Sequence, residues 1–315
     1  MTGTLRNDRQ QQAMKSQGPS LLRILHVVMT VGLGAVSCLS AGADASQSVA
    51  LDRSVPLDRP TLAEAQRLFY NAHYDEAAAL ILAWRSSDTE DLAAYELRTS
   101  ALHFQLRGML GDHPDKEKTF KQCVPCPDLM AAFVSDTARG QALARARLRT
   151  NPEDDEALFF LGKLDLNYVW LQLGTHGRKT GWNQYWEARK SLDALLKRNP
   201  QHVRARVARA WIDYIVDTKM PRGARWVLGG GSRKRALIAV REAARTEADF
   251  FIRAEAEFAL WDMQVRERNL TEAAMVARRL ALDFPDNREL VKFLKANDPS
   301  YSPHGYSDGT SVLRR

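Results

Sequence analysis

Apolar and small residues recur at helical spacing along most of this chain, most regularly between residues 151 and 287. Ala188, Leu192 and Leu195 follow one another at intervals of four and three residues, which places them on one face of a helix. Pro200 then ends that helix, because proline lacks a backbone N–H and its ring clashes with the preceding turn. The pattern predicts amphipathic helices joined by turns, and no segment shows the alternation expected of a strand.

The helical pattern is repeated, and two of its copies are longer than the others. Pro152 and Pro200 are 48 residues apart, and Pro200 and Pro285 are 85 residues apart. A repeat of two helices takes about 34 residues, so the first interval holds one repeat and a surplus, and the second holds two repeats and a surplus. We predict that the surplus forms two inserts, at about residues 174–182 and 219–232, each joining the two helices of one repeat.

Three features carry a resemblance to a known family: the stretch Tyr74–Ala77, the pair Leu161-Gly162 and the Asn-Pro pairs that end the repeats. In these features the chain resembles exported bacterial tetratricopeptide-repeat (TPR) proteins of uncharacterised type. The resemblance covers roughly residues 61–295 and implies an all-α fold, in which antiparallel helical hairpins stack as a right-handed solenoid. Arg209 and Ala210 stand where the repeat usually has Leu-Gly, so the copies have diverged.

The first 45 residues are predicted to be a secretory signal peptide. Lys15 and Arg23 precede an apolar stretch from residue 24 to residue 36, which is too short to favour a membrane span. Ala43-Asp44-Ala45 supplies the small residues of a cleavage site. We therefore expect an exported, periplasmic protein. The alternatives are a membrane anchor at an uncleaved N-terminus and a lipoprotein linked through Cys38.

The rest of the chain is expected to form three segments. Residues 46–60 hold two prolines and show no period, which is typical of a linker. Residues 61–296 carry the helical pattern and are predicted to be the TPR-like repeat domain. Residues 297–315 are polar, with proline and glycine but no period, and are expected to be a disordered tail.

The helical pattern is interrupted between Gly108 and Pro127, and this segment holds Cys123 and Cys126. In an oxidising compartment two cysteines three residues apart can form a disulfide, and we predict one here as a structural staple. The same spacing occurs in redox enzymes and in one half of a zinc site. Redox motifs of this kind normally lie in an α/β fold, and zinc would need further ligands such as His103, so both stay alternatives.

The two inserts and their flanks are rich in aromatic and basic side chains. Residues 201–245 hold eleven basic and three acidic side chains, although the net charge of the whole chain is only +7. Such a region attracts anions, for example acidic peptides, anionic lipid or anionic glycan. Equivalent turns lie on one edge of a stack of helical hairpins, so the two inserts are expected to be neighbours. The loop Gly229–Ser232 could hold an anion at the start of the next helix, or could be a plain turn with Ser232 as the helix cap.

Six side chains of this edge are our candidate ligand-binding or partner-binding residues: Arg178, Trp182, Tyr185, Arg222, Arg225 and Trp226. Tryptophan and arginine are the side chains that most often dominate the energy of binding interfaces. Functional residues also gather on loops that a rigid scaffold carries. The alternative is that the tryptophans only pack the two inserts against each other.

These features predict a non-enzymatic exported scaffold, which binds a partner protein or peptide through its groove and through the basic, aromatic insert edge. The seven histidines are scattered and none lies at the spacing of a metal site or a catalytic triad, so we expect neither a metal nor a cofactor. Export makes nucleic acid an improbable partner. The alternative function is a receptor for a small organic anion, as an accessory component of a transport system. The oligomeric state stays open.

Overall fold

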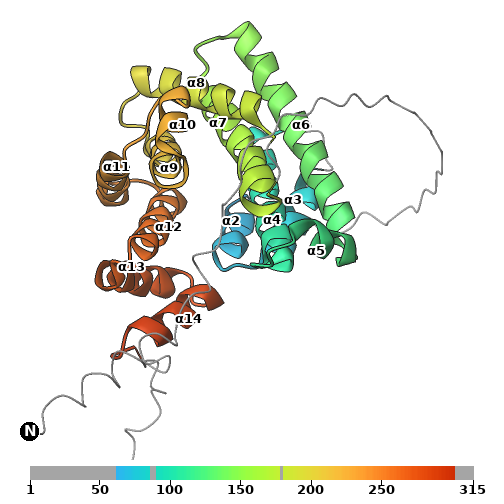
Figure 1. Ribbon diagram of the computed structural model, residues 1–315. Coiled ribbons are helices and arrows are strands. Elements are labelled where there is room, and N and C mark those ends of the chain that lie inside the picture. The colour runs from blue at the N-terminus through green and yellow to red at the C-terminus, as the bar shows by residue number, and fades with distance from the viewer. Residues whose placement is uncertain (1–61, 86–89, 178–179, 302–315) are drawn as a thin grey trace, which may run out of the picture. The chain divides into compact units, whose positions relative to one another are not determined.

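The computed structural model describes residues 62–85, 90–177 and 180–301. The chain divides into a unit of residues 1–59 and a unit of residues 60–315, and every described residue belongs to the second unit. Within these ranges all regular elements are helices and none is a strand, which confirms the all-α prediction (Figure 1). The predicted signal peptide and linker lie outside the described residues.

The first helices pack against one another in chain order. They are α2 (Leu62–Tyr70), α3 (Tyr74–Arg85), α4 (Leu92–Leu110), α5 (Lys116–Gln122) and α6 (Cys126–Thr150), and α4 contacts both α3 and α6. Asp91 begins α4, because its carboxylate accepts a hydrogen bond of 2.7 Å from the backbone N–H of Ala93. The predicted interruption from Gly108 to Pro127 is only partly correct, since α4 continues to Leu110 and α5 forms inside the segment.

The middle of the unit consists of α7 (Asp155–Val169), the π-helical turn η1 (Trp170–Thr175), α8 (Trp182–Arg198), α9 (Val203–Lys219), α10 (Arg222–Val227) and α11 (Arg233–Arg245). The apolar face predicted for α8 is buried, and Ala188, Leu192 and Leu195 are each 0% exposed. Gly162 allows α7 to approach this face closely, because a Cβ atom there would lie 2.9 Å from Leu192 Cγ. The Leu161-Gly162 pair thus marks a close contact between α7 and α8.

The last helices are α12 (Phe250–Arg266), α13 (Leu270–Asp283) and α14 (Arg288–Asn297), and each packs on the next. The described chain continues for four residues beyond α14. Arg278 of α13 pairs with Asp298 and donates a hydrogen bond of 2.6 Å to Ser300 Oγ. The start of the predicted tail therefore contacts α13, while residues 302–315 lie outside the described part of the chain.

The first described helix also contacts the last ones. The Tyr70 ring of α2 stacks on Phe258 of α12, with ring centroids 5.3 Å apart, and lies at the same distance from Phe284. Asn287 donates a hydrogen bond of 2.7 Å from its side-chain amide to the carbonyl of Tyr70. In Figure 1 the blue helix α2 accordingly lies beside the orange helix α12. An aromatic cluster therefore joins the first described helix, α2, to α12 and to the residue that ends α13.

None of the described helices is both long enough and apolar enough to cross a membrane.

Candidate functional site

The candidate site is the insert edge, which we define as the N-terminal half of α8 together with α10 and the loop Leu228–Ser232. Helix α8 begins directly after the first insert, with Gly181 at its N-cap position. Gly181 has φ +97°, a backbone conformation that side chains with a Cβ atom rarely adopt. The second insert contains α10, a short helix that the sequence did not predict. Both elements flank the turn of a helix pair, α7–α8 in one case and α9–α11 in the other.

Hydrogen bonds join the second insert to the helix that follows the first. Tyr185 is buried, and its hydroxyl donates a hydrogen bond of 2.9 Å to the carbonyl of Leu228. Arg189, one helical turn further along α8, donates to the carbonyls of Leu228 at 3.1 Å and Gly229 at 2.8 Å. Desolvation raises the pKa of Tyr185 above its ordinary value, and Arg189 partly offsets this rise. The second insert is therefore fixed against α8, the helix that begins where the first insert ends.

The loop Leu228–Ser232 directs carbonyl groups toward the guanidinium of Arg189. Gly229 has φ +76°, and a Cβ atom there would lie 2.9 Å from Cζ of Arg189. The N-terminus of α11 is already occupied, since Ser232 Oγ accepts from the N–H of Arg235 at 3.3 Å and an Asp217 carboxylate oxygen accepts from the N–H of Arg233 at 2.8 Å. These contacts favour the plain turn with Ser232 as its cap over the anion-binding loop.

Arg225 fastens α10 to the body of the molecule. Its guanidinium lies 2.6 Å from a carboxylate oxygen of Asp217, and its Nε donates a hydrogen bond of 2.9 Å to the carbonyl of Met220. The carboxylate of Asp217 therefore binds two elements, the first turn of α11 through the Arg233 N–H and α10 through Arg225. A short helix with few packing neighbours of its own gains a defined orientation from these contacts.

The outer face of the insert edge exposes large side chains. Trp226 is 85% exposed, Val227 62%, Trp186 43% and Trp182 38%. Four basic side chains in or directly after the second insert form no ion pair with any described residue: Lys219, Arg222, Lys234 and Arg235. Tryptophan buries a large area when it is covered, so leaving several exposed on one edge is unusual for a surface without a partner.

The six sequence-predicted residues fall into three groups. Trp182, Arg222 and Trp226 are exposed at the insert edge and available to a ligand. Tyr185 and Arg225 point inward and hold the edge together. Arg178 lies outside the described residues. Sequence reasoning did not select Arg189, Trp186 or Val227; the position of Arg189 four residues after Tyr185 was the available signal for a shared helix face.

A group of four charged side chains fills the space between the first helices of successive pairs. Lys163 of α7 lies 2.8 Å from Glu255 of α12 and 3.5 Å from Glu96 of α4. Arg204 of α9 pairs with the same two carboxylates, at 3.2 Å from Glu96. Burial alone would raise the pKa of Glu255, but Arg204 and Lys163 outweigh it and lower the pKa to about 2. Two cations and two carboxylates thus satisfy one another where α4, α7, α9 and α12 meet.

Two cavities lie away from the insert edge. One of about 360 Å³ lies between α11, α12 and α13, lined by charged side chains that include Arg241, Arg245, Glu257, Glu272 and Arg279. The other, of about 570 Å³, is open and follows α14. Arg241 pairs with Glu272, and Arg279 pairs with Glu257, so most of the charge in the first cavity is balanced. Among the described residues no group of three or more His, Cys, Asp or Glu side chains could hold a metal ion.

Comparison of the chain with protein-family models, with curated proteins and with solved structures found no match.

Proposed function

We propose that this chain is a non-enzymatic, exported binding scaffold of the TPR type, a right-handed stack of helical hairpins that docks a partner protein or peptide. The docking surface is the insert edge. The observation that carries the proposal is Trp226, a tryptophan 85% exposed on a helix that the ion pair and the hydrogen bond of Arg225 hold in place. A large exposed side chain on a fixed support loses little freedom on binding, which is what an interface anchor requires.

The proposed partner has acidic and apolar groups side by side. Lys219, Arg222, Lys234 and Arg235 supply positive charge in or directly after the second insert, and none of them forms an ion pair with a described residue. Such charges accelerate association with an acidic partner and select against a basic one. The tryptophans then supply the buried area that keeps the complex together.

The space between α4, α7, α9 and α12 is a poorer docking place than the insert edge. Glu96, Lys163, Arg204 and Glu255 pair across it, and their side chains are 7–18% exposed. A peptide in this space would have to break ion pairs that are already desolvated, at a cost of several kcal/mol. The insert edge requires no such loss, so the proposal places the partner there.

Co-purification from the cell envelope tests this proposal. Trp226→Ala and Arg222→Glu should each lower the recovery of the partner at least tenfold, since an interface anchor is commonly worth about 2 kcal/mol or more. Leu282→Ala is the matched control, because Leu282 is 84% exposed on α13, away from the insert edge. Equal recovery with all three variants would refute docking at the insert edge.

A receptor for a small organic anion is the second candidate function. The cavity between α11, α12 and α13 favours it, because Arg245 lines this cavity and forms no ion pair with a described residue. Titration calorimetry with a panel of dicarboxylates should then show binding that Arg245→Ala abolishes. Absence of heat with the wild-type protein would remove this candidate and leave the docking proposal untouched.

A further inference from the structure

The disulfide lies in the turn between α5 and α6 and its two sulfurs differ in environment. Cys123 follows the last residue of α5, and Cys126 is the first residue of α6, a helix of 25 residues. The predicted pairing is confirmed, with the two Cα atoms 5.4 Å apart. Cys126 is 0% exposed, whereas Cys123 is partly exposed. Cys123 is therefore the more accessible residue of the pair.

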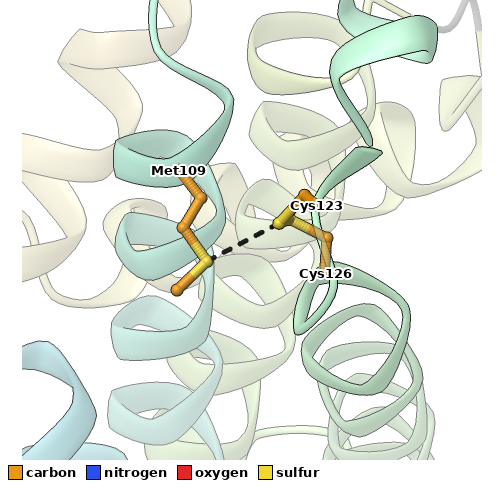
Figure 2. Close-up of a disulfide and its surroundings, with 3 residues drawn as sticks. All are labelled: Met109, Cys123 and Cys126. Atoms are coloured by element: carbon orange, nitrogen blue, oxygen red, sulfur yellow. Dashed lines mark hydrogen bonds between the residues drawn. A yellow bond between two sulfur atoms is a disulfide. The ribbon is translucent and has the colours of Figure 1, made fainter. Parts of the chain in front are cut away.

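Two exposed apolar residues lie beside Cys123, one next to it in the chain and one in contact with its sulfur. Val124 is 90% exposed and Met109, near the end of α4, is 45% exposed. Figure 2 shows the Met109 thioether directed toward the sulfur of Cys123, with the two sulfur atoms 3.9 Å apart. Two exposed apolar groups beside a disulfide form a small contact surface, which a protein approaching Cys123 would cover.

The disulfide contributes little to holding this turn in place. It closes a loop of only four residues, so the entropy that it removes from the unfolded chain is small. The backbone already forms the turn, with Cys123 N–H bonded to Phe120 O at 3.2 Å and Cys126 N–H bonded to Cys123 O at 3.3 Å. A disulfide that only stabilises the fold would contribute more if it closed a longer loop, so a second role for this pair is worth testing.

We propose that the Cys123–Cys126 disulfide is a thiol–disulfide exchange site whose reaction partner is a protein dithiol. A thiolate of that partner attacks Sγ of Cys123, the Cys123–Cys126 bond breaks, and the electron pair leaves on Sγ of Cys126. The second thiolate of the partner then attacks its own sulfur in the mixed disulfide and releases Cys123 as a thiolate. The partner dithiol is oxidised to a disulfide, the cysteine pair is reduced by two electrons, and the two thiolates take up the two protons.

The direction of attack follows from the greater exposure of Cys123, since burial among apolar side chains shields Cys126 and disfavours a thiolate there. Cys126 is also the first residue of α6, where the helix dipole stabilises a negative charge on the leaving sulfur. Asp128, in the first turn of α6, opposes this effect with its own negative charge. Asp128→Asn should accordingly speed reduction of the disulfide.

The first test measures reduction of the disulfide in the folded, full-length protein. Dithiothreitol is added, samples are quenched with acid, and freed thiols are counted by alkylation and peptide mapping, which separates Cys38 from the pair. We expect reduction at a rate that does not change between zero urea and the highest urea concentration that leaves the protein folded. Reduction that occurs only as the protein unfolds would identify a structural staple and overturn the proposal.

The second test compares two variants that both lack the disulfide and so serve as controls for each other. With oxidised glutathione, Cys126→Ser should form a mixed disulfide at Cys123 at least tenfold faster than Cys123→Ser does at Cys126. Equal rates would overturn the assigned direction of attack. Reduced thioredoxin should reduce the wild type several times faster than Val124→Asn, whereas dithiothreitol should reduce both at the same rate. Equal rates with thioredoxin would refute the apolar contact surface. If any variant fails to fold, the urea experiment on the wild type still decides the proposal.

Discussion

Removal of one carboxylate from the buried charge group should destabilise the protein strongly. Glu255→Gln keeps the shape of the side chain but leaves Arg204 and Lys163 to share the single carboxylate of Glu96. The pKa of Glu255 is about 2 against an ordinary 4.5. A tenfold change in an acid dissociation constant corresponds to about 1.4 kcal/mol. The side chain of Glu255 is only 14% exposed, so solvent screens this interaction little. We expect Glu255→Gln to lower the free energy of unfolding by about 3 kcal/mol at pH 7, in line with the cost of breaking a buried ion pair.

The pH dependence of the same effect follows from the lowered pKa. A carboxyl group with a lowered pKa in the folded state stabilises the protein above its unfolded pKa, near 4.5, and this stability is lost as the pH falls toward 2. Urea denaturation followed by circular dichroism, at intervals between pH 7 and pH 3, should show the wild type and Glu255→Gln converging at low pH. Glu247→Gln is the control, because Glu247 is exposed and forms no ion pair with a described residue. A loss below about 1 kcal/mol, or one that is the same at every pH, would refute the reasoning.

Further substitutions test the packing of the helices and of the insert edge. Gly162→Ala should destabilise the protein by about 1–2 kcal/mol, since its Cβ would lie 2.9 Å from Leu192 Cγ, whereas Gly108→Ala meets nothing within 4 Å and should stabilise α4 by about 0.5–1 kcal/mol. Thermal unfolding of the two variants side by side checks both, and a gain of stability in each would show that α7 and α8 do not pack so closely. Tyr185→Phe removes the hydrogen bond to the Leu228 carbonyl and should cost about 1 kcal/mol by urea denaturation. No loss would mean that this bond does not fasten the second insert.

The sequence predicted those features of the fold that depend on local residue type and spacing, such as which face of a helix is buried and which residue caps it. Ala188, Leu192 and Leu195 lie on a single helix face, and their spacing is enough to predict that this face is buried. Ser232 was a possible helix cap by residue type alone, and it caps α11. Both outcomes depend on neighbours only a few residues away in the chain.

Other features depend on contacts that a sequence does not display. Helix α10 has fewer than two full turns and contains Gly223, so it leaves no periodic pattern. Arg225 and Tyr185 looked like binding residues by type, but their partners are Asp217 and the Leu228 carbonyl. The charged group around Arg204 joins four helices whose residues are far apart in the chain. Only the three-dimensional arrangement shows that these side chains satisfy one another.

The contact of Tyr70 with Phe258 and Phe284 has a consequence for how the protein folds and unfolds. In an open row of repeats each unit is stabilised by its immediate neighbours, so one end can fray while the other stays folded. Here the first described helix completes its packing only when residues 188 to 217 positions later, Phe258 to Asn287, have been synthesised and placed. We expect this long-range pairing to slow folding and to couple both ends of residues 62–301 into one cooperative transition. Shortening the chain at either end would consequently weaken the opposite end as well.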